Sequence, residues 1–240
     1  MTVEQLHLEF KVFFDKVDSS AFPEFLDGEI DIYLNEGQER VIKQRYGKNN
    51  IYQKAFEESQ KRTDDLKNLV KTKFVTVSPE LAYTSIGKNI FRADIDSLYD
   101  DVELTSSSEI KYQFYLKSLA NTCEGACCSW DKVKLIQQDD ISVVAIDPFN
   151  RPRQGKALIF FEDGDIFIWA GDADVNGFQL TFLKRADQIN IGTYGQDRVD
   201  CELSEHLHKE ILQEAINIAI ENIGSPRVQT QGPINVKTTE

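Results

Sequence analysis

The chain has 240 residues, 41% of them hydrophobic, so it is long enough and apolar enough to bury a sizeable core. Lys and Arg total 27 against 40 Asp and Glu, which gives a formal net charge of -13 at pH 7. This excess of acid argues against a protein that binds nucleic acid by neutralising phosphates, although it leaves room for a local basic patch. No apolar run approaches the roughly eighteen residues that a membrane-spanning helix needs, and the N-terminus does not resemble a secretion signal.

The first part of the chain is predicted to be helical. Apolar residues recur at helical spacing over residues 4–18 and 29–46, and Gly47 stands where the second helix is expected to end. A third helix, rich in charge, is predicted over residues 52–69. The second helix carries a long polar face, which we interpret as solvated, with a contact between subunits as the alternative. This face consists of Asn35, Glu36, Gln38, Glu39, Arg40, Lys43, Gln44 and Arg45.

From Phe74 the pattern changes to that of β-strands. Period-two alternation begins there, and short strands are also predicted over residues 132–136 and 141–144. The segment ALIFFEDGDIFIWA is the best hairpin signal, because Asp163 and Gly164 form a tight turn between two apolar runs. A further strand, FQLTFLK, and a glycine-interrupted linker complete this region. The strand is expected to carry Phe178, Leu180 and Phe182 on one face, and the linker spans residues 189–199.

The clearest periodic signal is the segment ELSEHLHKEILQEAINIAIENIGSPR, residues 202–227. It is predicted to form one amphipathic helix, with Ser204 as its N-cap and with Gly224 and Pro226 ending it. Its apolar face is too wide for a solvated surface, so it must pack against another element or another subunit. That face consists of Leu203, Leu207, Ile211, Leu212, Ala215, Ile216, Ile218, Ala219, Ile220 and Ile223.

These elements predict the α+β class. The N-terminal and C-terminal helices are expected to form one helical bundle, and a β-rich middle segment is inserted between them. The expected division assigns residues 1–72 and 202–224 to the bundle and residues 73–201 to the insertion. Residues 225–240 have little apolar surface to bury and are predicted to form an extended C-terminal arm.

Three of the four cysteines lie in the segment TCEGACC. Because no secretion signal is recognised, the expected setting is a reducing cytosol, where free thiols are the default. A disulfide and a metal site remain alternatives, the latter completed by Cys201, His206 or His208. The C-x3-C-C spacing matches no common zinc pattern, and a histidine pair two residues apart more often caps or packs a helix. The clustered cysteines are Cys123, Cys127 and Cys128, and the third histidine of the chain is His7.

No other motif assigns a reaction to this chain. Its acidic run lacks the glycine and terminal glutamate of a calcium-binding loop, so we interpret it as a solvated loop. The chain carries no phosphate-binding loop, dinucleotide fingerprint or nucleophile elbow. We therefore predict a protein that is not an enzyme, with no catalytic, cofactor-binding or metal-ligating residues and no cofactor. The acidic run comprises Asp94, Asp96, Asp100, Asp101 and Glu103.

Several phrases of the chain suggest a family. Near the N-terminus stand VEQLHLEFKVFFDKVDS, YLNEGQERVIKQRYG and FEESQKRTDDLKNLV, and the middle contains VAIDPFNRPRQGKALIFF. The segment CELSEHLHKEILQEAINIAIENIGSPRVQTQ lies near the C-terminus. Together these phrases resemble virion structural proteins of tailed bacteriophages, in particular the head-to-tail connector ring proteins of crAss-like phages. The cysteine-rich segment is a departure from what we associate with such proteins.

The resemblance implies a subunit of a homo-oligomeric ring, a dodecamer, at the head-tail junction of a virion that is assembled in the host bacterial cytoplasm. The implied partners are other copies of the chain, the portal protein and adjacent connector or tail rings, with no membrane. DNA would pass through the lumen during ejection without sequence-specific binding. The acidic balance suits such a conduit, because like charges keep DNA from adhering to the wall.

On this hypothesis two groups of residues carry the structural role. Leu207, Ile211, Ala215 and Ile218 would pack the helical scaffold, and Gln229 to Ile234 would contact neighbouring subunits or layers. One alternative is a soluble intracellular protein that depends on a metal or on its thiols. Another is a different neck or tail component, such as a stopper or a tail-tube layer.

Overall fold

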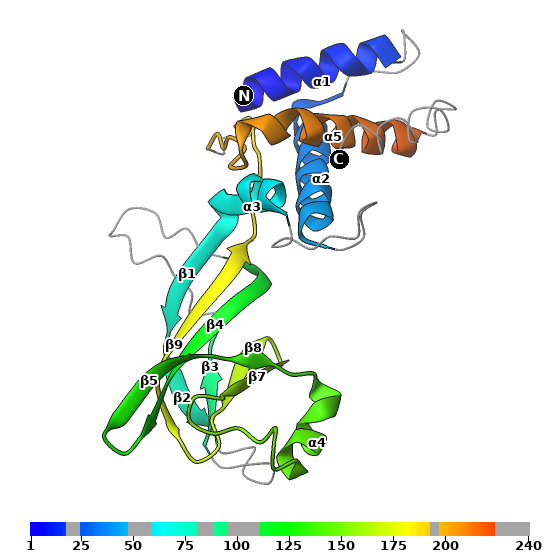
Figure 1. Cartoon of the computed structure of the whole chain (residues 1–240). Coiled ribbons are helices and arrows are strands. Elements are labelled where there is room, and N and C mark those ends of the chain that lie inside the picture. The colour runs from blue at the N-terminus through cyan, green and yellow to red at the C-terminus, as the bar shows by residue number, and fades with distance from the viewer. Residues whose placement is uncertain (18–24, 48–58, 81–88, 96–110, 193–196, 224–240) are drawn as a thin grey trace. The chain divides into compact units, whose positions relative to one another are not determined.

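The computed structural model describes residues 1–17, 25–47, 59–80, 89–95, 111–192 and 197–223 (Figure 1). The chain divides into two compact units, which we describe separately. The helical unit comprises Met1–Leu69 and Ala186–Glu240, and the β unit comprises Val70–Arg185. Helices and antiparallel strands occupy largely separate stretches of the chain, which confirms the α+β class.

The helical unit contains the predicted helices of both chain ends. The second helix begins where Glu29 folds back onto the Leu26 N–H. It ends at Gly47 as predicted, but Gly47 is extended, with φ -77° and ψ 163°, rather than left-handed. The third helix covers only the end of its predicted range, and residues 52–58 lie outside the described part. The bounds are α1 Val3–Val17, α2 Asp27–Tyr46, α3 Gln60–Leu66, the 3-10 turn Lys67–Leu69 and α5 His208–Ile223.

The C-terminal helix begins later than the sequence predicts. Ser204 makes no side-chain cap bond, and a 3-10 turn at Glu205–Leu207 precedes α5. This turn is closed by the Leu207 N–H, which donates to the Ser204 carbonyl at 2.9 Å. The predicted stop at Gly224 and Pro226 lies outside the described residues.

The wide apolar face of α5 is covered within its own unit. α5 crosses α2 and also contacts α1 (Figure 1), and the three helices share one buried cluster. An aromatic group formed by Phe10, Phe14, Phe25 and Tyr33 closes one side of this cluster. The face therefore supports the fold of one chain. The members of the buried cluster include Leu6, Phe10, Ile30, Leu34, Leu212, Ala215, Ile216, Ala219 and Ile220.

The linker that leads into the C-terminal helix belongs to the helical unit, although the expected division placed it in the β insertion. Ile189 is buried in the helical cluster. The Asn35 side chain of α2 donates to the Ile189 carbonyl at 2.9 Å and accepts from the Ile189 N–H at 2.8 Å. The helical unit therefore begins again at residue 186 rather than 202. The Asn35 side chain of α2 satisfies both backbone polar groups of Ile189, which fixes this segment against the helix.

Within the described residues the β unit contains two sheets, ordered β1-β9-β4-β5 and β2-β3-β8-β7-β6. Neighbouring strands are antiparallel except β6 and β7. Phe178, Leu180 and Phe182 of β9 enter one core with residues of the other sheet, which confirms their predicted shared face. The strands are β1 Val70–Val75, β2 Val77–Glu80, β3 Ile90–Ala93, β4 Tyr112–Glu124, β5 Cys127–Lys132, β6 Lys134–Leu135, β7 Leu158–Glu162, β8 Asp165–Trp169 and β9 Asp174–Lys184.

The strongest predicted hairpin is confirmed as β7 and β8. Asp163 and Gly164 join these strands with φ of 51° and 86°, the two positive angles that a tight hairpin turn requires. The longest strand, β4, was not predicted, because its register with β9 shifts at three places and interrupts simple alternation. Residues 132–136 do not form one strand either, since Val133 separates β5 from β6 in different sheets.

The predicted strand over residues 141–144 is wrong. This segment forms the short helix α4, Ile141–Ile146, which follows a 3-10 turn at Gln138–Asp140. Its β-branched residues suggested a strand, but strand propensity depends on having a neighbour to pair with. Only Ile141 of this helix is buried, so there is no alternation of buried and exposed residues to stabilise a strand.

Candidate assembly surfaces

The four residues predicted to pack the helical scaffold are buried. Leu207, Ile211, Ala215 and Ile218 are all at most 6% exposed. The helices α2 and α5 approach so closely at Gly37 that a Cβ built there would lie 2.8 Å from the Ile211 carbonyl oxygen. These residues therefore hold the unit together and leave the assembly surfaces to be found elsewhere.

The long polar face of α2 is only partly solvated, which corrects the sequence interpretation. Gln38 and Arg45 are 3% and 4% exposed. The Gln38 amide donates to the Asp187 carbonyl at 3.1 Å, because the segment before α5 lies against α2. Five of the other polar residues line an open hollow together with Ile218 of α5. They are Glu36, Glu39, Arg40, Lys43 and Gln44.

Arg45 lies in a buried ionic cluster that joins α2 to α3 and α5. Its Nε lies 2.9 Å from Asp65 Oδ2, and its Nη2 contacts the Glu210 carboxylate. Asp65 also lies 2.6 Å from His206 Nε2. Burial raises the pKa of Glu210, and the positive charge of Arg45 opposes that shift. All four side chains find partners inside the unit, so the cluster supports the fold.

The remaining histidines also have structural partners. His7 Nε2 lies 2.8 Å from Asp31 Oδ1, and Asp31 Oδ2 accepts from the Ile191 N–H at 3.3 Å. His208 is buried, its Nε2 lies 3.0 Å from the Leu203 carbonyl, and burial lowers its pKa. The expectation that the histidine pair caps or packs the helix start is thus confirmed.

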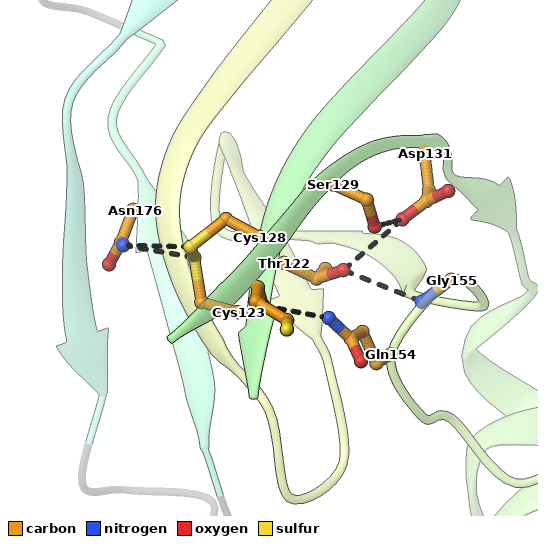
Figure 2. Close-up of a disulfide and its surroundings, with 9 residues drawn as sticks. Thr122, Cys123, Cys128, Ser129, Asp131, Gln154, Gly155 and Asn176 are labelled. Atoms are coloured by element: carbon orange, nitrogen blue, oxygen red, sulfur yellow. Dashed lines mark hydrogen bonds between the residues drawn. A yellow bond between two sulfur atoms is a disulfide. The ribbon is translucent and has the colours of Figure 1, made fainter. Parts of the chain in front are cut away.

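Two of the clustered cysteines form a disulfide (Figure 2). Cys123 and Cys128 lie directly opposite each other in the β4–β5 hairpin, with Cα atoms 4.1 Å apart. The expectation that both residues carry free thiols is therefore wrong. The register of the hairpin places the two cysteines opposite each other, and the spacing of cysteines along the sequence does not show that register. Cys127, which is exposed, and Cys201 are free.

The disulfide also removes both sulfurs from the metal hypothesis. Over the described ranges, no group of three or more His, Cys, Asp and Glu side chains is placed to hold a metal ion. Burial raises the pKa of the Cys201 thiol to about 11, so this sulfur stays protonated near neutral pH. Of the predicted acidic run, only Asp94 lies within the described residues.

The first exposed apolar surface lies on α1. Leu8 and Val12 are 65% and 45% exposed and stand one helical turn apart, on the side away from the buried Leu6 and Phe10. We call these two residues the α1 pair. Neighbouring exposed apolar side chains make this face of α1 a candidate contact surface.

The second and larger exposed apolar surface lies on α4 and the turn after it. Val143, Ile146 and Phe149 are 64%, 84% and 84% exposed, and we call them the α4 patch. The turn is held in place, because the Asp147 carboxylate accepts from the Phe149 N–H at 2.9 Å and from the Asn150 amide at 2.6 Å. These bonds lower the pKa of Asp147. The patch is thus presented by an ordered turn.

A third exposed feature is an aromatic pair on the four-stranded sheet. Phe74 of β1 and Trp130 of β5 meet edge to face with ring centroids 5.9 Å apart, although their strands are at opposite edges. Gly177 makes this possible, since a Cβ there would lie 3.2 Å from the Trp130 ring. Periodicity alone did not predict this pair.

Two further expectations concern the chain end and membranes. The arm residues Gln229 to Ile234 lie outside the described part of the chain. None of the helices within the described residues is long and apolar enough to cross a bilayer.

Comparison with known proteins adds two findings. A family model described as phage tail ring protein 3/4 matches residues 1–229. The chain is also similar to ring protein 4/5 of Bacteroides phage crAss001. The two are 22% identical over 236 aligned residues, and the alignment covers 91% of this chain and 92% of that protein.

Proposed function

We propose that this chain, which belongs to the phage tail ring protein 3/4 family, forms a homo-oligomeric ring in the head-to-tail connector of a phage particle. As a structural ring protein its role would be mechanical rather than catalytic. The ring would join the portal to the tail and leave a channel for DNA. The resemblance to crAss-like phage connector proteins supports this position, as does the similarity to ring protein 4/5 of Bacteroides phage crAss001.

The observation that carries the ring is that a helix of each unit, α1 in one and α4 in the other, presents exposed apolar side chains. A ring of identical subunits is built from a head-to-tail interface, in which one surface of each subunit meets a different surface of the next. The α1 pair belongs to the helical unit, and the α4 patch belongs to the β unit. Two chemically similar but structurally different patches are what such an interface uses, whereas a twofold dimer needs only one.

The proposed channel follows from charge. A net charge of -13 is repelled by phosphate, so a lumen lined by acidic side chains would let DNA pass without adhering. We propose that DNA contacts are therefore not sequence-specific. An assembled ring whose lumen proved basic would contradict this part of the proposal.

The arm is proposed as a second kind of contact. Residues 225–240 would reach a neighbouring subunit or layer, with Gln229 to Ile234 as the contacting residues. In the described part of the chain the buried core is complete by Ile220, so the shortened chain is expected to fold and to lose assembly. Normal incorporation of the shortened chain into particles would count against the arm.

The experiment that tests the ring is a mass measurement followed by imaging. The purified chain, alone and with the portal protein, is measured by light scattering and then imaged by electron microscopy. We expect a discrete ring with twelve subunits that binds the portal. A chain that stays monomeric under all these conditions and is absent from disrupted particles would overturn the proposal. Density in another neck or tail layer would instead support a stopper or tail-tube role.

A further inference from the structure

The Cys123–Cys128 disulfide lies at the tip of the β4–β5 hairpin (Figure 2). Cys128 is exposed, whereas Cys123 is only 5% exposed. The two bonded cysteines therefore differ in exposure, which makes Cys128 the expected point of attack for a soluble thiol. The tip is also weakly supported, because β5 is mostly exposed and, among the described strands, it is an edge strand paired with β4 alone.

Asn176 is aimed at the buried sulfur. Its Nδ2 donates to Cys123 Sγ at 3.0 Å and lies 3.9 Å from Cys128 Sγ. In the β9 register, Val175 pairs with Thr122 and Gly177 pairs with Asn121, so Asn176 is an extra residue in β9. Such a bulge redirects a side chain, and here it brings an amide donor to the disulfide.

We propose that the Cys123–Cys128 disulfide is a reversible thiol–disulfide exchange site that locks the hairpin tip. A thiolate of a soluble dithiol attacks Cys128 Sγ and forms a mixed disulfide, while the Cys123–Cys128 bond breaks and Cys123 leaves as a thiolate. The second thiol of the reagent then attacks its own sulfur in the mixed disulfide and releases Cys128. The net reaction converts one protein disulfide and one dithiol into two protein thiols and a cyclic disulfide.

Asn176 acts as a positioning residue in this reaction. A bonded disulfide sulfur is a weak hydrogen-bond acceptor, whereas a thiolate carries full charge and accepts more strongly. The Asn176 amide therefore stabilises the leaving thiolate of Cys123 more than the intact disulfide, and the exchange is accelerated.

The other cysteines do not take part. Side chains alternate along a strand, so Cys127 lies on the opposite face of β5 from Cys128. Cys201, with its pKa raised to about 11, is a poor nucleophile near neutral pH. A Cys127→Ser background thus isolates the disulfide without removing any sulfur from it.

The site of attack is tested with a monothiol. The full-length Cys127→Ser protein is treated with mercaptoethanol, and mixed disulfides are trapped with acid and mapped by mass spectrometry. We expect the adduct on Cys128. An adduct mainly on Cys123 would overturn the assigned direction of attack.

The role of Asn176 is tested by reduction rates with dithiothreitol in the same background. Asn176→Ala is expected to slow reduction about tenfold, the value of one hydrogen bond to a charged group. Gln154→Ala is the matched control, since Gln154 Nε2 donates to the Cys127 carbonyl at 2.9 Å and supports the tip without touching sulfur. We expect its rate to stay within about twofold. Equal slowing by both variants, or faster reduction of Asn176→Ala, would overturn the positioning role.

The lock is tested by amide hydrogen exchange with and without dithiothreitol. Reduction is expected to speed exchange across residues 119–132 and to leave the helical unit unchanged. Unchanged exchange in residues 119–132 would show that the bond does not hold the tip. All three measurements use the isolated chain, so they succeed or fail independently of ring formation.

Discussion

Gly37 lies where α2 and α5 approach each other closely. A Cβ at this position would lie 2.8 Å from the Ile211 carbonyl oxygen and 2.9 Å from the Ala215 nitrogen, and backbone atoms cannot move aside cheaply. We expect Gly37→Ala to lower the free energy of unfolding by about 1–3 kcal/mol. At Gly28, near the start of the same helix, an added Cβ would meet nothing within 4 Å, so Gly28→Ala is expected to be neutral or stabilising. Urea unfolding of both variants provides the comparison.

Arg45 is the centre of the buried ionic cluster. Removing it leaves Asp65, which is 1% exposed, without its main positive partner. Arg45→Ala is therefore expected to destabilise the fold by about 3–5 kcal/mol. Lys43, two residues earlier, pairs with Glu39 at 2.8 Å on the exposed surface, and Lys43→Ala should cost about 0.5 kcal/mol or less. Comparable losses in thermal unfolding would show that the Arg45 cluster is not specially coupled to the fold.

Cys201 gives the fold a dependence on alkaline pH. Burial raises the pKa of its thiol from 9.0 to about 11, and the thiol donates to Gln38 Oε1 at 3.3 Å. The folded state holds this proton more tightly than the unfolded chain, so the stability it contributes is complete below pH 9 and is lost as pH rises toward 11. A shift of this size corresponds to about 2–3 kcal/mol.

The test compares urea unfolding of the native protein and Cys201→Ala from pH 8 to 11. Lysine and tyrosine titration affects both proteins, so the informative quantity is the difference between their curves. We expect the native protein to lose more stability over this range than the variant. Parallel curves would mean that Cys201 titrates in the folded protein as it does in the unfolded chain.

At the scale of elements, α4 packs Ile141 into a small hydrophobic cluster and leaves its opposite face exposed. Introducing a charge into the α4 patch should block association without lowering thermal stability, because these side chains are exposed. We expect Ile146→Glu and Phe149→Glu to remain folded and to lose the oligomer by light scattering. Ser78→Glu on the exposed edge strand β2 adds the same charge elsewhere and should assemble normally. Assembly of all three variants would remove the α4 patch from the interface.

At the scale of the whole molecule, each unit has its own hydrophobic core. A local defect is therefore expected to loosen one unit more than the other. In native-state hydrogen exchange, Gly37→Ala should speed exchange in residues 1–69 and 186–223 and leave residues 70–185 largely protected. Uniform acceleration along the chain would indicate that the two units unfold as one cooperative body.

Features that depend on local spacing could be predicted from the amino-acid sequence. Apolar residues repeated every three to four positions predicted the C-terminal helix, and Asp163 and Gly164 between two apolar runs predicted the β7–β8 hairpin. The quoted phrases also led to the phage ring family, which the family model confirmed over residues 1–229. These signals are readable because each arises from residues close together in the chain.

Features that depend on partners far away in the chain became apparent in the folded structure. The Cys123–Cys128 bond follows from hairpin register, and burial of Arg45 follows from the approach of Asp65 and Glu210 on other helices. Distant partners also decide the place of Ile189, which is bound by Asn35 of α2 and belongs to the helical unit. They likewise decide the structure of α4, whose β-branched residues form a helix rather than a paired strand. Propensity and periodicity describe what a segment prefers alone. Whether a thiol forms a disulfide, a charge is buried or an apolar side chain is packed depends on which part of the chain lies against it.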